Sequence, residues 1–93
     1  MAPEFDRATA LRAMESLDVS ACAKKEKGAA GCTQVQLQFE PNGNVSAAWA
    51  CETTLSTVVR ECIEKRFKAV SVPSFRDRPV LARATACVGG AKR

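Results

Sequence analysis

The chain has no histidine and no tyrosine, and it has one tryptophan among its 93 residues. The absence of histidine removes the side chain most often used as a zinc ligand, as a general base and as the partner that activates a cysteine. The scarcity of aromatic side chains leaves little from which to build a stacking platform for single-stranded nucleic acid. These absences disfavour zinc binding, acid–base catalysis and base stacking as functions.

Long apolar stretches are missing as well. No run approaches the roughly 20 residues that a helix needs to cross a bilayer. The N-terminus lacks the basic and then apolar pattern of a signal peptide. If the protein is exported, we expect its targeting or anchoring segment to lie outside this chain.

The composition that remains is that of one small soluble domain. The chain is 46% hydrophobic and 26% charged, which is ordinary for a globular protein and suits a single core. We expect one domain over residues 1–88 and a flexible tail over 89–93. The net charge of +4 permits acidic partners, but the basic residues are spread along the chain, as on a solvated surface.

Five cysteines stand at positions 22, 32, 51, 62 and 87, and no two of them form a CxxC pair. This spacing argues against a zinc knuckle and against a thioredoxin-like redox site. Two interpretations remain: disulfides in an oxidising compartment, or buried thiols that act as small hydrophobic residues. The odd count leaves at least one thiol without a partner within the chain.

The N-terminal segment 5–22 has the pattern of an amphipathic helix. Asp6 is placed to cap its N-terminus, and apolar residues recur behind it at helical spacing. These apolar residues are Leu11, Met14 and Leu17. The following segment, 24–31, is polar and then glycine-bearing, and it is expected to form a loop.

A β-hairpin is the clearest local pattern. Residues 32–39 alternate, with Val35, Leu37 and Phe39 on one side and three glutamines on the other. Asn42-Gly43 then supplies the positive φ that a tight turn needs. The apolar side of the second strand is expected to consist of Val45, Ala47, Trp49 and Cys51, with Asn44, Ser46 and Ala48 opposite. Trp49 is therefore expected to lie in the core or half-buried in the sheet.

Helical spacing returns after Glu52, where Thr53, Thr54 or Ser56 can cap a second helix. Pro73 ends this helical region. The apolar stripe of the helix consists of Val59, Cys62, Ile63, Arg66, Phe67 and Val70, with Arg66 reaching to the rim.

The small, mostly apolar segment Val80–Val88 is the candidate for a last strand. The expected order is helix, strand, strand, helix, strand. This is an α+β fold in which a three-stranded sheet carries both helices on one face. The glutamines of the first strand would then face water.

Several motifs occur in a distinctive order. Phe5-Asp6 and Cys22 precede Val35-x-Leu37-x-Phe39-x-Pro41-Asn42-Gly43-x-Val45, and Cys62-Ile63-Glu64-x-x-Phe67 and Val72-Pro73-x-Phe75 follow. Over roughly residues 5–88 this order resembles the AgmX/PglI-type C-terminal domain of bacterial gliding-motility and envelope proteins, a relative of the TonB C-terminal domain. One departure is that family members often carry a glycine soon after the last aromatic, whereas Arg76-Asp77-Arg78 follows Phe75 here.

The resemblance implies a TonB C-terminal-like fold and a periplasmic domain of an inner-membrane-anchored protein whose anchor lies outside this chain. Relatives of the TonB type use the last strand as an open edge, to which a short segment of an outer-membrane partner adds as a further strand. The resemblance further implies a role in energy transduction or gliding motility. The partner would be a TonB-box-like segment of an outer-membrane or periplasmic protein.

By this resemblance, the last strand forms the partner-binding edge. Main-chain pairing demands little of side chains, which suits the small residues there. The alternative is an ordinary edge strand that only completes the sheet. Arg78 and Arg83 would favour an acidic partner segment. The edge residues are Val80, Leu81, Ala82, Arg83, Ala84, Thr85 and Ala86.

A structural disulfide is expected between Cys22, at the end of the first helix, and Cys62, on the stripe of the second. The resemblance carries part of this expectation, and two buried free thiols are the alternative. Closing a loop of about 40 residues is worth roughly 4 kcal/mol in the loop-entropy model. Cys32, Cys51 and Cys87 permit a second bond, but the sequence does not choose among their pairings.

The leading hypothesis is therefore a non-catalytic module, without metal or cofactor, that binds a protein segment and no nucleic acid. One alternative is a small basic nucleic-acid-binding α+β domain, whose affinity would fall steeply with salt. Another is a thiol enzyme, which would need a cysteine of depressed pKa. A third is a purely structural domain. Weak pairing of two copies through open sheet edges is also consistent with the sequence.

Overall fold

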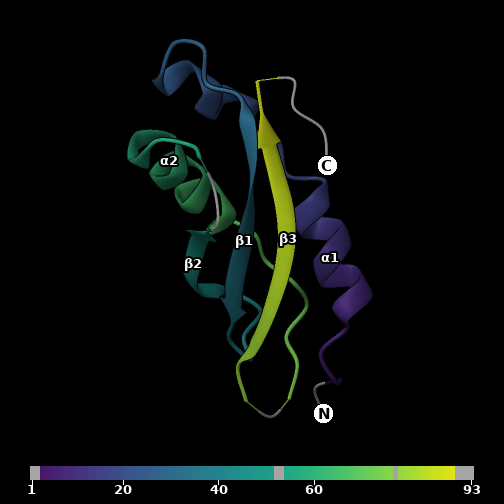
Figure 1. The fold of residues 1–93 in the computed structure, drawn as a ribbon. Coiled ribbons are helices and arrows are strands. Elements are labelled where there is room, and N and C mark those ends of the chain that lie inside the picture. Colours follow the sequence, from purple (N-terminus) through teal and green to yellow (C-terminus); the bar gives the residue numbers. More distant parts are fainter. Residues whose placement is uncertain (1–2, 52–53, 77, 90–93) are drawn as a thin grey trace.

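A computed structural model describes residues 3–51, 54–76 and 78–89. The expected cap candidate Thr53 and most of the expected tail (90–93) lie outside these residues. In chain order the elements are α1 (Arg7–Glu15), the 3₁₀ helix η1 (Ser20–Lys25), β1 (Gly31–Phe39), β2 (Val45–Cys51), α2 (Thr57–Phe67) and β3 (Val80–Val88). The fold is α+β, and its three-stranded antiparallel sheet has the order β2-β1-β3 (Figure 1).

The first helix is shorter than the expected segment 5–22. Asp6 caps α1 as predicted, and its carboxylate accepts hydrogen bonds from two backbone N–H groups of the first turn. The helix ends at Glu15, and the side chain of Asp18 then accepts a hydrogen bond from the Ser20 N–H at 2.8 Å. Such a local side-chain bond competes with helix continuation. Here it lies between the end of α1 and the start of η1. Cys22 therefore lies in η1 and does not end the first helix.

A bulge interrupts the hairpin at the start of β2. Phe39 pairs with Val45, as an uninterrupted hairpin requires, but the next pair joins Gln38 to Ala47. Ser46 is thus an extra residue on β2. One extra residue turns every later side chain of the strand to the opposite face of the sheet.

The bulge overturns the expected orientation of β2. Ala48 and Ala50 face the core and are buried, while Trp49 is 44% exposed and Cys51 is exposed. The prediction that Trp49 and Cys51 lie on the buried side was wrong because the sequence alternation continues smoothly through the bulge. The small side chains that replace them leave room for α2 to pack against β2.

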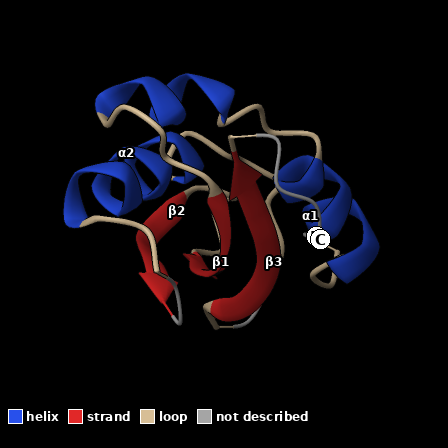
Figure 2. Ribbon diagram, turned by 45° about the horizontal axis from the view of Figure 1, so that its top comes forward, coloured by secondary structure: helices blue, strands red, loops and turns tan. Residues whose placement is uncertain are grey.

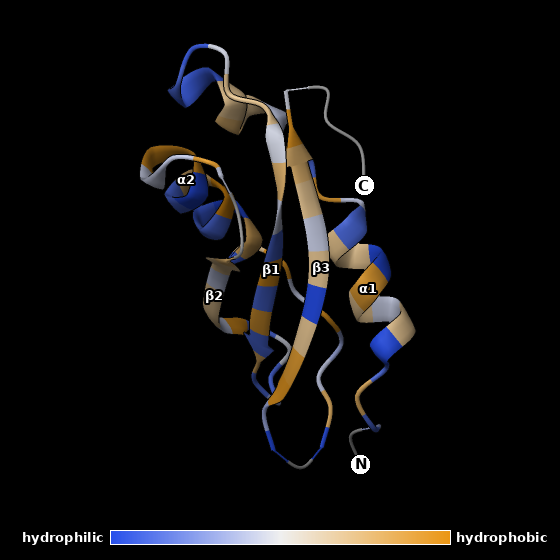
Figure 3. Ribbon diagram, viewed as in Figure 1, coloured by the Kyte–Doolittle hydropathy of each residue, from blue (hydrophilic) through white to orange (hydrophobic). Residues whose placement is uncertain are grey.

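The helices pack on one face of the sheet (Figure 2). Ser56 caps α2, its hydroxyl accepting from the Val59 N–H at 3.4 Å. The opposite sheet face carries the glutamines of β1, which alternate with apolar residues along that strand (Figure 3). The core side chains with at most 1% exposure include Ala10, Met14, Cys22, Val35, Leu37, Phe39, Val59, Ile63 and Phe67.

Two disulfides link elements that are distant in the sequence. Cys22 of η1 is bonded to Cys62 of α2, the pair expected from the sequence, with Cα atoms 5.6 Å apart. Cys32 of β1 is bonded to Cys87 of β3, which settles the second pairing. Cys51 remains free and exposed. Two disulfides in so short a chain are typical of an extracytoplasmic, oxidising compartment. No helix within the described ranges is long and apolar enough to cross a membrane.

Disulfide mapping checks this arrangement. Alkylation of the unreduced protein followed by proteolysis and mass spectrometry should give one cross-linked peptide pair for Cys22–Cys62 and one for Cys32–Cys87. Cys51 alone should carry the alkyl group. A Cys32–Cys51 cross-link would contradict the pairing of β1 with β3 at this end of the sheet.

The hairpin turn is held by the segment that follows α2. The Val72 N–H donates to the Gly43 carbonyl at 2.9 Å, and the Phe75 N–H donates to the Pro41 carbonyl at 2.8 Å. Gly43 has a φ of +92°, and a Cβ at this position would collide with the Val72 carbonyl oxygen. The turn therefore needs glycine both for its backbone angle and for the close approach of this segment.

A matched pair of glycine substitutions separates these two requirements. Gly28 also has a positive φ, of +80°, but a Cβ there would meet nothing within 4 Å. Gly28→Ala should cost about 1 kcal/mol for the backbone angle alone. Gly43→Ala should cost about 3 kcal/mol or more, because the collision adds to that cost. Urea unfolding measures both, and equal losses would show that the close approach at Gly43 contributes nothing.

Candidate partner-binding edge

β3 is an edge strand of the described sheet, because it pairs only with β1, along its whole length. The Cα atoms of Cys32 and Cys87 are 4.0 Å apart, the close spacing of a non-hydrogen-bonded pair. The N–H and C=O groups of Cys87 therefore point away from β1, and strand alternation gives every second residue the same orientation. The residues whose backbone N–H and C=O groups point away from β1 are Leu81, Arg83, Thr85 and Cys87.

Most of these outward groups have no partner. Among the described residues, the Leu81 carbonyl alone is engaged, by Nη1 of Arg7 at 3.2 Å. The backbone groups of Arg83 and Thr85 are unpaired over the same ranges. All seven predicted edge residues thus lie on β3, but Val80 and the three alanines between it and Cys87 direct their backbone groups towards β1.

On the other edge of the sheet, β2, one outward backbone group is engaged. Glu64 of α2 accepts a hydrogen bond from the Ala50 N–H of β2 at 2.8 Å. Just before β2, Asn44 forms an isolated antiparallel bridge with Ser71. A carboxylate and a crossing segment of this kind are common means of preventing an edge strand from pairing with another chain. Among the described residues, each edge strand thus has one outward backbone group bonded to a helix side chain, the Ala50 N–H on β2 and the Leu81 carbonyl on β3.

Arg7 is held at the β3 edge by two contacts. Besides its hydrogen bond to Leu81, its guanidinium carbon lies 5.7 Å from the centre of the Phe5 ring, in a cation–π arrangement. Phe5 in turn packs against Phe39 and Phe75, with ring centres 5.5 and 5.0 Å apart. This aromatic cluster fixes the start of α1 beside the first residues of β3 (Figure 1).

Asp6, which precedes Arg7, caps the N-terminus of α1. Its hydrogen bond from the Thr9 hydroxyl, at 2.7 Å, is the main cause that lowers the pKa of the Asp6 carboxyl below its ordinary value. A second cause is the bond from the Thr9 backbone N–H. The carboxylate is therefore ionised at neutral pH and already engaged within α1.

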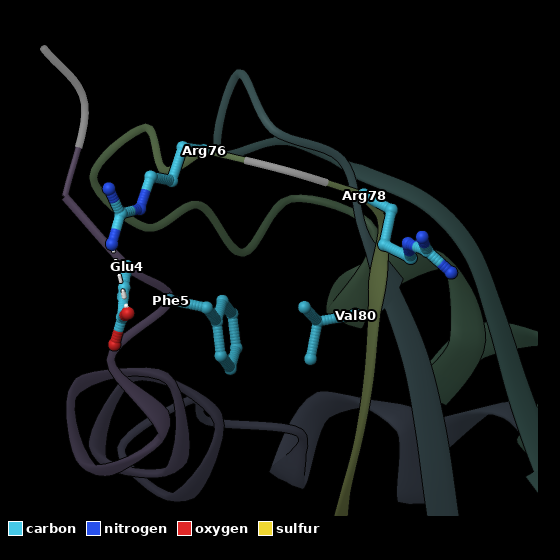
Figure 4. A pocket seen from close by; sticks show the side chains of 5 residues that line it. All are labelled: Glu4, Phe5, Arg76, Arg78 and Val80. Carbon is cyan, nitrogen blue, oxygen red and sulfur yellow. Dashed lines mark hydrogen bonds and ion pairs between the residues drawn. The ribbon is translucent and has the colours of Figure 1, made fainter.

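Two hollows lie along the β3 edge. One, of about 630 Å³, is lined by Glu4, Phe5, Arg76, Arg78 and Val80. Figure 4 shows the Phe5 ring and the Val80 side chain facing each other, with the Glu4–Arg76 ion pair on one side and Arg78 on the other. The second hollow, of about 420 Å³, is lined by Arg7, Leu11, Gln36, Leu81, Ala82 and Arg83.

Sequence reasoning located β3 but missed Arg7 and Glu64. Arg7 is 74 residues from Leu81, and Glu64 is 14 residues from Ala50. No local pattern marks either contact, because both depend on how a helix lies against the sheet. Trp49 and Cys51, by contrast, lie on β2, away from the β3 edge. In the described part of the chain, no three metal-ligating side chains come together.

Comparisons of this chain with protein-family models, with curated protein sequences and with solved structures found no match.

Amide hydrogen exchange tests the proposed orientation of β3. The amides of Arg83 and Thr85 should exchange quickly, whereas those of Ala84 and Ala86, which donate to β1, should be slowed at least about 100-fold. Ala50 is an internal control, since its outward amide should be slow until Glu64→Ala exposes it. Slow exchange at Arg83 and Thr85 in the free protein would mean that the β3 edge is already paired.

Proposed function

We propose that this chain is a non-catalytic protein-interaction module that binds an extended segment of another protein by adding it as a strand to β3. The unpaired outward backbone groups of β3 are the observation that carries this proposal. Arg83 and Thr85 of β3 have unpaired backbone groups among the described residues, and Arg7 engages the Leu81 carbonyl alone. An open edge supplies main-chain hydrogen bonds to an incoming strand, and these provide affinity without a demanding side-chain pattern.

The compartment that we propose is the periplasm. The two disulfides support an extracytoplasmic location, and the motif resemblance to the TonB C-terminal type supports the periplasm in particular. On the same basis we place the module in an inner-membrane-anchored protein of energy transduction or gliding motility. Its partner would be an outer-membrane or periplasmic protein.

The nucleic-acid alternative has less support. Phe39, Phe67 and Phe75 are buried and Phe5 is partly buried in the aromatic cluster, so Trp49 is the one aromatic ring with large exposure. A single exposed ring on β2 is a poor base-stacking surface. The arginines at the β3 edge flank unpaired backbone groups, an arrangement better suited to a peptide strand than to a phosphate backbone.

A titration followed by NMR tests the proposal. Peptides from periplasm-facing segments of outer-membrane proteins should shift the amide signals of Leu81, Arg83 and Thr85 first and slow their hydrogen exchange. For any peptide that binds, methylation of alternate peptide nitrogens is the decisive step. Methylation of the nitrogens whose N–H groups face β3 should abolish binding. Methylation of the nitrogens in between, which face away from β3, should be tolerated. Shifts confined to other elements, or equal tolerance of both sets, would exclude strand addition.

A pair of substitutions at Thr85 tests the same point from the side of the protein. Thr85→Pro removes an outward N–H without removing a hydrogen bond to β1, and edge positions of this kind tolerate proline. We expect it to weaken peptide binding about tenfold. Thr85→Val keeps the N–H and the preference for a strand, so its affinity should match that of the wild type. Calorimetry measures both, and equal affinities for the two variants would contradict pairing at Thr85.

A further inference from the structure

Three arginines stand along the outer edge of β3 without a carboxylate partner among the described residues. Arg7 donates to the Leu81 carbonyl, and Nε of Arg83 donates to the Gln36 side chain at 2.9 Å. Arg78 is exposed and lines the first hollow beside Val80. Neither bond of Arg7 or Arg83 neutralises its charge, because both acceptors are neutral. Over the described residues, the edge therefore carries three positive charges without an ion-pair partner.

Two described carboxylates next to α1 have hydrogen-bond or ion-pair partners of their own. Glu4 forms an ion pair with Arg76 at 3.0 Å. Asp6 accepts three hydrogen bonds from the first turn of α1, which direct its carboxylate to that turn but leave its charge in place. The charges of Arg7, Arg78 and Arg83 thus remain available to a molecule that approaches β3 from outside.

The positions of the arginines match the path of an added strand. Arg7 and Arg83 line the same hollow, over Leu81 and Ala82. Arg78 stands just before β3, next to the apolar pair Phe5 and Val80 (Figure 4). A strand paired with β3 would hold its side chains opposite those of Leu81 and Arg83 on the open face of the sheet. Opposite charges at such cross-strand positions attract, and like charges repel.

We propose that the segment bound by β3 is acidic, with carboxylates at alternate positions on the side that faces Arg83 and an apolar residue at the Phe5–Val80 hollow. This inference rests on the proposed strand addition and specifies its partner. A guanidinium binds a carboxylate through two parallel N–H···O bonds, so Arg83 and Arg7 can hold one acidic side chain between them. Arg78 attracts a second, towards the start of β3.

The probes are three synthetic peptides of about eight residues, a usual strand length. They alternate valine with glutamate, glutamine or lysine. At low salt the glutamate peptide should bind about tenfold more tightly than the glutamine peptide, and the lysine peptide should bind most weakly. The preference should shrink when salt is raised to about 0.5 M. Calorimetry gives the affinities, and the amide signals of Arg83 and Thr85 report where each peptide binds.

Arginine variants show whether the preference comes from this edge. Arg83→Gln and Arg78→Gln should each reduce the glutamate-to-glutamine affinity ratio about threefold. Arg12→Gln is the matched control, because Arg12 is an exposed arginine of α1 that donates to Thr9 and lines neither hollow. It removes the same charge and should leave the ratio unchanged.

The outcomes separate this inference from the proposed function. If the glutamate and glutamine peptides perturb the β3 amides with equal affinity, the partner is not selected for acidity, although strand addition stands. If Arg12→Gln lowers the affinity ratio as much as Arg83→Gln and Arg78→Gln do, the attraction comes from net charge. The proposed recognition of carboxylates by Arg83 and Arg78 is then wrong. If no peptide perturbs the β3 amides, strand addition fails and the acidic partner fails with it.

Discussion

The structure depends on β1 lying in the middle of the sheet. This strand is hydrogen-bonded on both sides, to β2 and to β3, and its Val35, Leu37 and Phe39 side chains have no exposed surface. Burying three large side chains from one short strand supplies much of the hydrophobic stabilisation of so small a core. Because β1 takes the central place, the two other strands must both be edges. The proposed binding of a partner strand therefore concerns these two edges.

The two disulfides support this small core at different places. Cys22–Cys62 joins η1 to α2 above the sheet, and Cys32–Cys87 joins the central strand to the candidate binding strand. Each closes a long loop, of 40 and 55 residues in sequence separation, worth about 4 kcal/mol in the loop-entropy model. The second bond also ties β3 covalently to β1. An added strand could therefore pair with the outer edge of β3 without displacing β3 from the sheet.

The bulge at Ser46 determines which face of β2 α2 packs against. By turning Ala48 and Ala50 inward, it gives β2 a surface of small side chains against which α2 can lie. That position brings Glu64 within hydrogen-bonding distance of the Ala50 N–H. The same bulge turns Trp49 outward to the open face. At the other edge of the sheet, Arg7 of α1 donates to the Leu81 carbonyl of β3, and the outward backbone groups of Arg83 and Thr85 are unpaired among the described residues. The contacts that each helix makes with its edge strand thus follow from one irregularity and the placement of two helices.

Local patterns in the sequence were sufficient for much of this protein. Asp6 as the first cap, the turn at Asn42-Gly43 and the strand Val80–Val88 could all be predicted, because capping, tight turns and strand propensity depend on neighbouring residues. The choice of Cys87 as the partner of Cys32, the inward face of β2 and the contacts of Arg7 and Glu64 were decided by the tertiary structure alone. Each depends on a register or a packing angle between segments far apart in the chain, and a shift of one residue, as at Ser46, reverses a whole strand face without leaving a mark in the alternation of the sequence.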